Sequence, residues 1–300
     1  MTDTRERIGF IGVGLMGHGM AKNLVEKGWP LTVIAHRNRA PVEDLVSRGA
    51  REAKSVAELA KACDIVHLCV TASPQVEALV RGPGGLKENL APGSIVIDTS
   101  TSDPSSTLAL AAELAESGIT LVDAPLSRTP KEAWAGTLDC MVGCDAETFR
   151  RIEPVIGAWA GKIVHIGGTG DGHKMKLVNN FLAMGYAALY SEALVLAQKV
   201  GIPPARVDSV IRGGRMDSGF YQTFMKWVLE RDPEAHRFTL VNGLKDTRYI
   251  EAMADAAGMA NPIGNAVKNA FAMAVAQGRG EDYVPMLSDV VAELNGTRLA

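Results

Sequence analysis

Lys176, Asn179 and Asn180 are the residues of this chain whose types and spacing best suit chemistry. Lys176 and Asn180 are four positions apart, so they share one face of a helix. A lysine can release and take back a proton, and an asparagine amide can hydrogen-bond a reacting oxygen or hold the lysine in place. Lys176 is therefore the candidate general acid/base, Asn180 its assisting residue and Asn179 a candidate substrate contact. Lys174, two positions from Lys176, falls on a different face.

These residues lie near the start of Gly170–Gly201, a stretch whose pattern predicts one helix of roughly 28 residues, about 42 Å long. Its apolar residues occur on more than one side. A helix that is apolar nearly all round is expected to be buried by other protein. The positive end of the helix dipole and a dry surrounding both disfavour a charged ammonium, which suits proton transfer. We interpret His67, His165 and His173 as structural or surface residues.

A glycine-rich turn lies near the start of the chain, between an apolar run at 8–11 and a helical pattern that ends at Gly28. Its GxGxxG spacing gives a tight turn, lets the backbone approach a pyrophosphate and lets helix pack on strand, while the helix N-terminus attracts the anion. A second apolar run at 31–35 follows at the distance of a βαβ unit. The pattern predicts dinucleotide binding by Gly12, Val13, Gly14, Leu15, Met16 and Gly17.

The residues after this second strand indicate which dinucleotide binds. An Asp or Glu at this point would bind the ribose 2′-OH of NAD, whereas an Arg favours the 2′-phosphate of NADP. His36 occupies the position and is followed by Arg37, Asn38 and Arg39, with no carboxylate among them. This favours NADP over NAD, with contacts from His36, Arg37 and Asn38. The alternative is that the arginines are solvated loop residues.

Apolar runs that alternate with helical patterns continue after this unit, at 65–70, 94–97 and 119–122. Such alternation predicts an α/β fold with a mostly parallel, doubly wound sheet of the Rossmann type. Ligands of such sheets bind at the carboxyl ends of the strands. The polar clusters at 98–101 and 127–129 both follow strands, so we expect them near the bound ligands.

The glycine-rich segment 167–172 separates this region from one that shows only helical patterns. We therefore expect a nucleotide-binding domain at 1–170 and an all-helical domain at 171–300 for substrate binding and oligomerisation, linked by the long helix. The apolar character of that helix predicts a homodimer or homotetramer.

Composition excludes several classes of protein. The chain has 300 residues, 47% of them apolar, and a net charge of −3, without the basic stripe that nucleic-acid binders show. No run approaches 18 apolar residues without a polar break, and the N-terminus lacks a secretory signal, so neither a membrane span nor export is expected. The four cysteines, Cys63, Cys69, Cys140 and Cys144, show no CxxC pair and no metal spacing. We expect reduced thiols, a cytoplasmic location and no metal site.

Five motifs follow one another along the chain: GVGLMG at 12–17, DTST at 98–101, DAPLS at 123–127 with GTL at 136–138, GDGHKMKLVNN at 170–180, and LKD at 244–246. In this order, and over essentially the full length, they resemble the β-hydroxyacid dehydrogenase family, which includes 3-hydroxyisobutyrate dehydrogenase and tartronate semialdehyde reductase. The resemblance implies hydride transfer between a nicotinamide, NADP or NAD, and a small anionic 3-hydroxy acid or its semialdehyde.

The resemblance also implies roles for individual residues. The family's catalytic lysine falls on Lys176 and its assisting asparagine on Asn180. Its substrate-carboxylate loop falls on Ser127, Arg128 and Thr129. Its further cofactor contacts fall on Val70, Thr71, Thr101 and Lys245.

The substrate loop departs from the family's usual Ser-Gly-Gly. A Gly-Arg-Thr loop is associated with sulfolactaldehyde reductase, whose substrate carries a sulfonate, so Arg128 and Thr129 resemble an enlarged anion-binding site. Sulfolactaldehyde reduction is accordingly an alternative function. Another possibility for Arg128 is that it points to solvent or pairs with Glu132. Val70-Thr71 also replaces the family's usual Leu-Pro, which changes only the detail of that contact.

Two alternatives come from outside this activity. One is a non-catalytic, NADP-dependent binding protein of the same fold, and the other is an imine-reducing relative. Both kinds of protein lack the catalytic lysine, so Lys176 argues against them.

Overall fold

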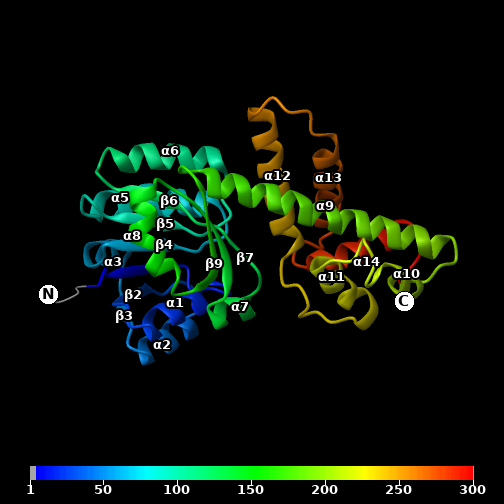
Figure 1. Cartoon of the computed structure of the whole chain (residues 1–300), viewed down its shortest axis with the longest axis horizontal. Coiled ribbons are helices and arrows are strands. Elements are labelled where there is room, and N and C mark those ends of the chain that lie inside the picture. The colour runs from blue at the N-terminus through cyan, green and yellow to red at the C-terminus, as the bar shows by residue number, and fades with distance from the viewer. Residues whose placement is uncertain (1–4, 300) are drawn as a thin grey trace. The chain divides into compact units, whose positions relative to one another are not determined.

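The structure is a computed structural model that describes residues 5–299. It divides into two compact units, Met1–Lys176 and Leu177–Ala300. The division falls inside helix α9, Asp171–Lys199 (Figure 1). The long helix expected from the apolar pattern is therefore present, and the residues proposed for proton transfer lie in its first turns.

The first unit is built on a β-sheet with strand order β3-β2-β1-β4-β5-β6-β8-β7, and β9 pairs with β8. The pairs from β3 through β6 are parallel, whereas β8 runs antiparallel to β6 and β7. This confirms the mostly parallel, doubly wound sheet. The strands are β1 Ile8–Ile11, β2 Leu31–Ile34, β3 Arg51–Ala53, β4 Ile65–Leu68, β5 Ile95–Asp98, β6 Thr120–Asp123, β7 Leu126–Ser127, β8 Leu138–Gly143 and β9 Ala160–Gly167.

Successive residues of the central strands enter two separate cores. In β5, Ile95 and Ile97 join one cluster while Val96 joins the other. Because side chains of a strand alternate between the two faces of a sheet, each face buries its own core under its own helices. One face carries α1 Gly17–Glu26, α2 Ala40–Ser47 and α8 Ala146–Ile156; the other carries α3 Val56–Ala62, α4 Ser73–Arg81, α5 Leu86–Asn89 and α6 Pro104–Ala115. The short α7, Pro130–Ala135, follows β7.

Local signals at the helix ends explain where several helices begin. Ser55 accepts a hydrogen bond from the Glu58 N–H and so caps α3. The Glu58 carboxylate accepts a hydrogen bond from the Lys54 N–H at 2.9 Å. Asp103 caps α6, where Pro104 stands at the first helical position.

The regular elements in the described residues of the second unit are helices, apart from one isolated β-bridge between Thr239 and Tyr283. Its core gathers side chains of α9 with Tyr221, Phe224 and Phe271. After α9 the chain forms α10 Pro204–Ile211, α11 Gly219–Glu230, α12 Leu240–Ala256, α13 Pro262–Ala276, the 3₁₀ turn η1 Val284–Met286 and α14 Leu287–Leu294.

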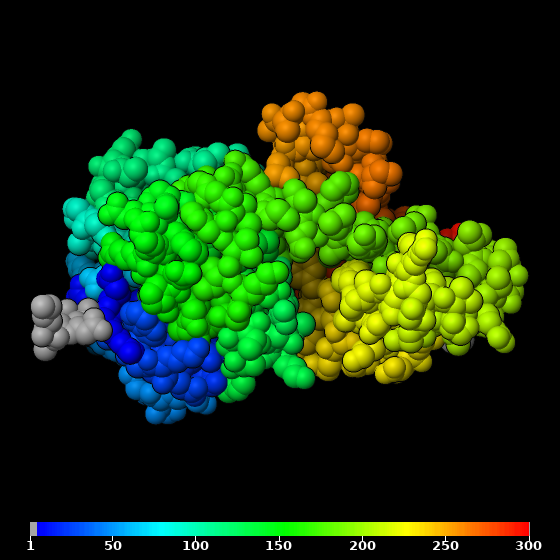
Figure 2. Space-filling model, in the orientation of Figure 1, coloured from blue at the N-terminus to red at the C-terminus, as the bar shows by residue number. Residues whose placement is uncertain are grey.

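Helix α9 is not buried on every side within this chain. One face packs into the core of the second unit through Met184, Leu194 and Val195. Another face stays exposed, and its later turns lie at the surface in the space-filling view (Figure 2, yellow-green). By length and composition, α9 is the one helix among the described residues that could cross a membrane, and 39% of its 18-residue apolar window is buried within the protein. The exposed apolar side chains of α9 include Leu182, Tyr186, Leu189 and Leu196.

Candidate active site

The carboxyl ends of the central parallel strands lie level with one another. Ile11 pairs with Leu68, Leu68 with Asp98, and Asp98 with Asp123, so β1, β4, β5 and β6 end in one row. The segments that follow these strands carry the glycine-rich turn and the polar clusters singled out in the sequence. Since strand order reverses between β1 and β4, this edge is also the switch point at which doubly wound sheets bind ligands.

The glycine-rich turn has no room for a side chain at two of its glycines, Gly12 and Gly17. Gly12 has φ of +100°, and a Cβ there would collide with the carbonyl of Cys69. A Cβ on Gly17 would collide with the carbonyl of Gly12, whereas one on Gly14 would meet nothing within 4 Å. Helix α1 starts at Gly17 with no side-chain cap and no acidic residue in its first turn, so no carboxylate of that turn competes with an anion for the positive end of the helix. Val13 is buried, Met16 half-buried and Leu15 exposed.

In the loop after β2, Arg37 and Arg39 have different surroundings, which the sequence alone did not reveal. Arg39 is engaged by carboxylates, with Glu52 at 3.0 Å and Glu43 at 3.5 Å. His36 and Arg37 are exposed. The Asn38 side chain accepts a hydrogen bond from the Ala40 N–H at the start of α2. Of the two arginines, Arg39 is therefore the one already held by carboxylates, whereas Arg37 is exposed.

The residues after β4 and β5 are joined to each other. The Val70 N–H donates to the Ser100 hydroxyl at 3.0 Å, and the Thr99 hydroxyl donates to the Leu68 carbonyl at 2.7 Å. Thr101 is half-buried and Thr71 exposed at this edge of the sheet. These bonds fix the two predicted cofactor-contact segments side by side.

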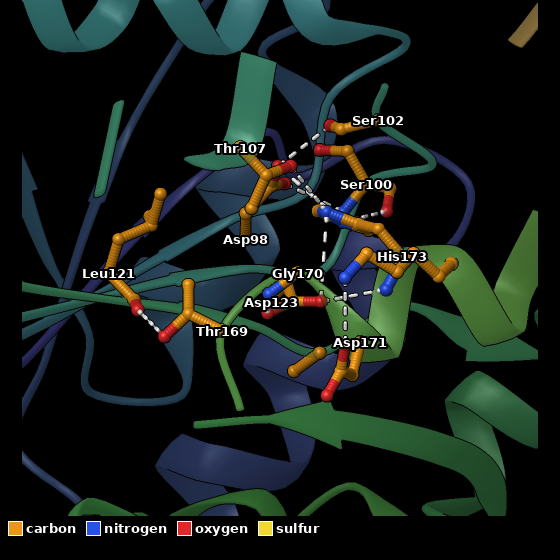
Figure 3. A network of polar contacts seen from close by, with 12 residues as sticks. Asp98, Ser100, Ser102, Thr107, Leu121, Asp123, Thr169, Gly170, Asp171 and His173 are labelled. Atoms are coloured by element: carbon orange, nitrogen blue, oxygen red, sulfur yellow. Dashed lines mark hydrogen bonds and ion pairs between the residues drawn. The ribbon is translucent and has the colours of Figure 1, made fainter. Parts of the chain in front are cut away.

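A buried polar network ties the start of α9 to the ends of β5 and β6 (Figure 3). Asp123 accepts hydrogen bonds from the backbone N–H groups of Gly170 at 2.6 Å and His173 at 2.7 Å. Asp98 accepts from the Ser100 N–H at 2.9 Å and the Ser102 hydroxyl at 2.7 Å. Burial raises the pKa of the Asp123 carboxyl, although His173 and the two N–H donors oppose that shift. The carboxylate satisfies N–H groups that the first turn of a helix otherwise leaves unpaired.

His173 completes this network and is fully buried. Its Nε2 lies 3.1 Å from the Ser100 carbonyl, which can only accept, so Nε2 carries a proton. Its Nδ1 lies 2.8 Å from the Thr107 hydroxyl of α6. The side chain therefore joins three segments, and our interpretation of His173 as structural fits this position.

Lys176 follows His173 by three residues on α9 and is half-buried. Lys174 is exposed and pairs with Asp171 at 2.9 Å, so its ammonium is committed to the helix's own first turn. The network around His173 thus holds the turn of α9 from which Lys176 projects, at the edge of the sheet where ligands bind.

In the second unit, Asn180 and Lys245 meet at Asp246, a residue that sequence reasoning missed. The Asn180 amide donates to Asp246 Oδ2 at 2.5 Å, and the Lys245 ammonium lies 3.0 Å from Oδ1. Asp246 is fully buried and Asn180 nearly so, while Asn179 is exposed. The available signal was the LKD motif, in which an acidic residue stands on the buried face of a helix. Asp246 orients an amide and holds a cation next to it.

The Ser127–Thr129 loop has a strained centre. Arg128 has φ of +89°, in the left-handed region that favours glycine. Its guanidinium pairs with Asp139 of β8 at 3.0 Å, rather than with Glu132. Glu132 instead forms a capping box with Thr129 at the start of α7, so Thr129 has a structural partner of its own. Ser127 is half-buried in β7.

Comparison with known proteins matches this geometry to one family. Residues 7–167 match the NAD-binding domain of 6-phosphogluconate dehydrogenase, and residues 170–288 match the NAD-binding family of NADP-dependent 3-hydroxyisobutyrate dehydrogenase. The chain belongs to the β-hydroxyacid dehydrogenase family. As a member, it is an NAD(P)-dependent oxidoreductase that acts on a hydroxyl group, and the resemblance found in its five motifs is confirmed.

The names of individual relatives give different substrates. The chain is 40% identical to 2-(hydroxymethyl)glutarate dehydrogenase of Eubacterium barkeri over 206 residues, 68% of each protein. It is 31% identical to 3-sulfolactaldehyde reductase of Escherichia coli over 284 residues, 94% of this chain and 95% of the relative. A 3-hydroxyisobutyrate dehydrogenase of Salmonella typhimurium has the same fold, with a TM-score of 0.84 and 26% identity, over 95% of this chain and 99% of that one.

The glycine-rich turn of this β-hydroxyacid dehydrogenase fits the cofactor of its family. The turn is closed at Gly12 and Gly17, open at Gly14 and followed by an uncapped helix N-terminus. These features suit a pyrophosphate, which needs close backbone approach and N–H donors. Among the described residues, no group of three His, Cys, Asp or Glu side chains could hold a metal ion.

Proposed function

We propose that this enzyme interconverts a small anionic semialdehyde and its 3-hydroxy acid, with Lys176 as general acid/base and Asn180 as its assisting residue. The bound nicotinamide supplies or accepts the hydride. Lys176 gives a proton to the forming alkoxide oxygen during reduction and takes it back during oxidation. Asn180 and Asn179 are the proposed amide contacts at that end of the substrate, and Lys245, held by Asp246, the contact near the nicotinamide.

One observation carries this proposal: Asp123 links the proposed base to the proposed substrate loop. Its carboxylate caps the start of α9, three residues before Lys176, and its backbone ends β6, from which the chain enters the Ser127–Thr129 loop. A displacement of either segment would therefore be passed to the other. Such rigid support is what a proton donor and an anion-binding loop need in order to act on one small molecule.

The substrate anion is proposed to bind Ser127, Arg128 and Thr129. Arg128 keeps a strained backbone where glycine would be relaxed, and strain of this kind costs on the order of 1–3 kcal/mol and persists mainly at functional sites. A guanidinium presents paired donors to a carboxylate or a sulfonate. The compounds named for the three relatives are small and anionic. 3-Sulfolactaldehyde has three carbons and 3-hydroxyisobutyrate four, which supports a substrate with its anion on a short chain, whereas 2-(hydroxymethyl)glutarate has six.

Sulfolactaldehyde reduction is the second candidate. It is favoured by Arg128-Thr129 and by the relative of that name, which aligns over nearly the whole chain. Ser127 keeps the serine of the carboxylate-binding type, so we place the carboxylate semialdehyde first. A non-catalytic or imine-reducing role would require the function of Lys176 to be absent.

NADP is the proposed cofactor, because Arg37 is exposed at the end of β2 and no acidic side chain replaces His36. Val70, Thr71 and Thr101 are proposed to contact it from the neighbouring strand ends. We further propose a cytoplasmic homodimer or homotetramer. The four cysteines are free thiols, which supports the cytoplasmic location. The exposed apolar side chains of α9 offer a surface for a second copy of the chain, which supports the oligomer.

The test is an assay of reduced-nicotinamide oxidation against a panel of aldehydes. The panel contains methylmalonate semialdehyde, tartronate semialdehyde, succinate semialdehyde, sulfolactaldehyde and, as uncharged controls, propanal and butanal. The proposal expects the highest kcat/KM with one of the anionic aldehydes and with NADPH. Equal rates on charged and uncharged aldehydes, or no turnover of any, would contradict it.

A further inference from the structure

Helix α7, which follows the substrate loop, packs directly on helix α1, which follows the nucleotide-binding turn. At the contact, α1 has Gly19, where a Cβ would lie 2.5 Å from the carbonyl carbon of Ala133 and 2.6 Å from the N atom of Trp134. Both clashes are with backbone, which cannot move aside as a side chain can. The absence of a side chain at Gly19 therefore lets the two backbones touch.

Asn23, one turn further along α1, fastens this contact. It is 6% exposed, and its amide lies 2.9 Å from the Ala133 carbonyl and 3.2 Å from the Trp134 carbonyl, as well as 2.7 Å from the carbonyl of Gly19. Three acceptors around one end of the side chain identify that end as the NH₂ group. The last carbonyls of a helix have no partner within it, and Asn23 gives those of α7 a donor from another helix. The Ala133 carbonyl also accepts from the Gly136 N–H at 3.3 Å, and the Trp134 carbonyl from the Lys22 ammonium of α1 at 3.3 Å.

The side chain of Trp134 strengthens the same junction. The Lys22 ammonium lies 5.0 Å and the Arg48 guanidinium 5.5 Å from the centroid of its ring. The His18 ring packs nearly perpendicular to it, with the two ring centroids 5.2 Å apart. His18 directly follows Gly17 of the nucleotide-binding turn. The tryptophan thus contacts the first turn of α1 while its own carbonyl is held by Asn23.

Helix α7 depends on this support. It has six residues, far fewer than a helix needs for stability on its own in water. Its other end is closed by Thr129, whose capping box with Glu132 leads directly into the substrate loop. Whatever fixes α7 on α1 therefore also fixes Thr129 and the residues before it.

We propose that Asn23 is a positioning residue that couples the nucleotide site to the substrate loop. Nucleotide binding at the N-terminus of α1 reduces the motion of this helix. The hydrogen bonds of Asn23 to α7 then reduce the motion of α7 and of Ser127–Thr129 as well. The consequence for substrate selection rests on the proposed role of that loop, whereas the coupling itself does not.

Hydrogen–deuterium exchange tests the coupling directly, in the full-length protein with and without NADPH. In the wild type, NADPH is expected to slow exchange across 127–135 by roughly tenfold or more. In Asn23→Ala that protection is lost, while the NADPH dissociation constant, measured by fluorescence, changes less than about threefold, because Asn23 lies beyond the phosphate-binding turn.

Asn89→Ala is the matched control. Asn89 also donates from its side-chain amide to a carbonyl four residues earlier, that of Gly85, but away from this junction. It should keep the wild-type response. If Asn23→Ala does not fold, Asn23→Ser, which retains a shorter donor, should show reduced protection.

Retention of NADPH-dependent protection at 127–135 in the Asn23 variants would overturn the proposal, as would its absence in the wild type. A second readout is selectivity: Asn23→Ala should lose roughly tenfold in kcat/KM for an anionic semialdehyde and less for butanal. If protection depends on Asn23 but no semialdehyde is reduced by the wild type, the coupling stands and the proposed function fails.

Discussion

The side-chain amide of Asn180 donates a hydrogen bond of 2.5 Å to Asp246, a carboxylate with no exposure to solvent. The second oxygen of Asp246 lies 3.0 Å from the ammonium of Lys245. A buried carboxylate of this kind is stabilised only by such partners, and in return it fixes where they point. Two residues proposed to act at the reaction centre therefore share one support in the second unit.

Replacing that support should impair turnover more than binding. Asp246→Ala leaves the Asn180 amide without its acceptor and Lys245 without its counter-charge. Hydrogen bonds to charged groups contribute about 1.5–3 kcal/mol, so kcat should fall roughly 10- to 150-fold. Steady-state kinetics with saturating NADPH measure the loss. Asp255→Asn, on the exposed surface of the same helix, should behave as wild type; an unchanged kcat in Asp246→Ala would show that Asp246 is not needed there.

Arg128 should discriminate between charged and uncharged substrates. A charge-assisted hydrogen bond contributes about 1.5–3 kcal/mol, so Arg128→Ala should lose roughly 10- to 150-fold in kcat/KM on the anionic substrate. The loss on butanal should be much smaller. Lys131→Ala removes an exposed cation from the neighbouring helix and serves as control. Equal losses on both aldehydes would mean that Arg128, paired with Asp139, only supports the loop.

Cofactor preference should depend on Arg37 and not on Arg39. Arg39 already binds Glu52 and Glu43, so Arg39→Ala should leave the ratio of kcat/KM for NADPH and NADH unchanged. Arg37→Ala should lower kcat/KM for NADPH alone, and His36→Asp should shift preference toward NADH by binding the 2′-OH. Kinetics with both cofactors decide the matter. A wild-type preference for NADH would show that Arg37 does not bind a phosphate.

Much of the fold of the first unit could be predicted from the sequence, because the patterns that indicate it are local. Glycines at fixed spacing, short apolar runs and one very long helix are each written within a few dozen residues, and the sheet, the turn and α9 confirm them. The buried network did not follow. Asp98, Asp123 and His173 come from three segments, and only folding brings them together.

The partners of the predicted site residues could not be predicted either. Asp246 lies 66 positions from Asn180, and no periodicity links them. Arg128 was expected to bind the substrate anion, with solvent or Glu132 as the alternative; the Asp139 partner, to which its left-handed backbone and the β7–β8 pairing bring it, was not expected. Tertiary contacts of this kind depend on register and turn geometry, which residue types alone do not determine.

The buried His67 should make the first unit sensitive to acid. Burial lowers its pKa to about 3, while an unfolded histidine titrates near 6.5. Between these values the unfolded chain binds more protons, so stability falls as pH drops below about 6.5, by about 2 kcal/mol at pH 5. His67→Phe, which can still stack on Phe10, should lose less stability than wild type between about pH 7.5 and 5.

Urea denaturation followed by tryptophan fluorescence measures this difference, since Trp159 lies against His67. His36→Gln, at an exposed position, should keep the wild-type pH dependence. Parallel pH profiles for wild type and His67→Phe would mean that His67 does not control acid stability.

The most direct test of the central claim is kcat for Lys176→Met on the best anionic semialdehyde, with NADPH affinity measured alongside. Lys174→Ala, at the exposed lysine two residues away, is the control and should keep full activity. A positioned acid supplies roughly 10²–10⁴-fold, so Lys176→Met should lose at least a hundredfold in kcat with little change in NADPH binding. Retention of more than about a tenth of the wild-type kcat would contradict the assignment of Lys176 as the proton donor.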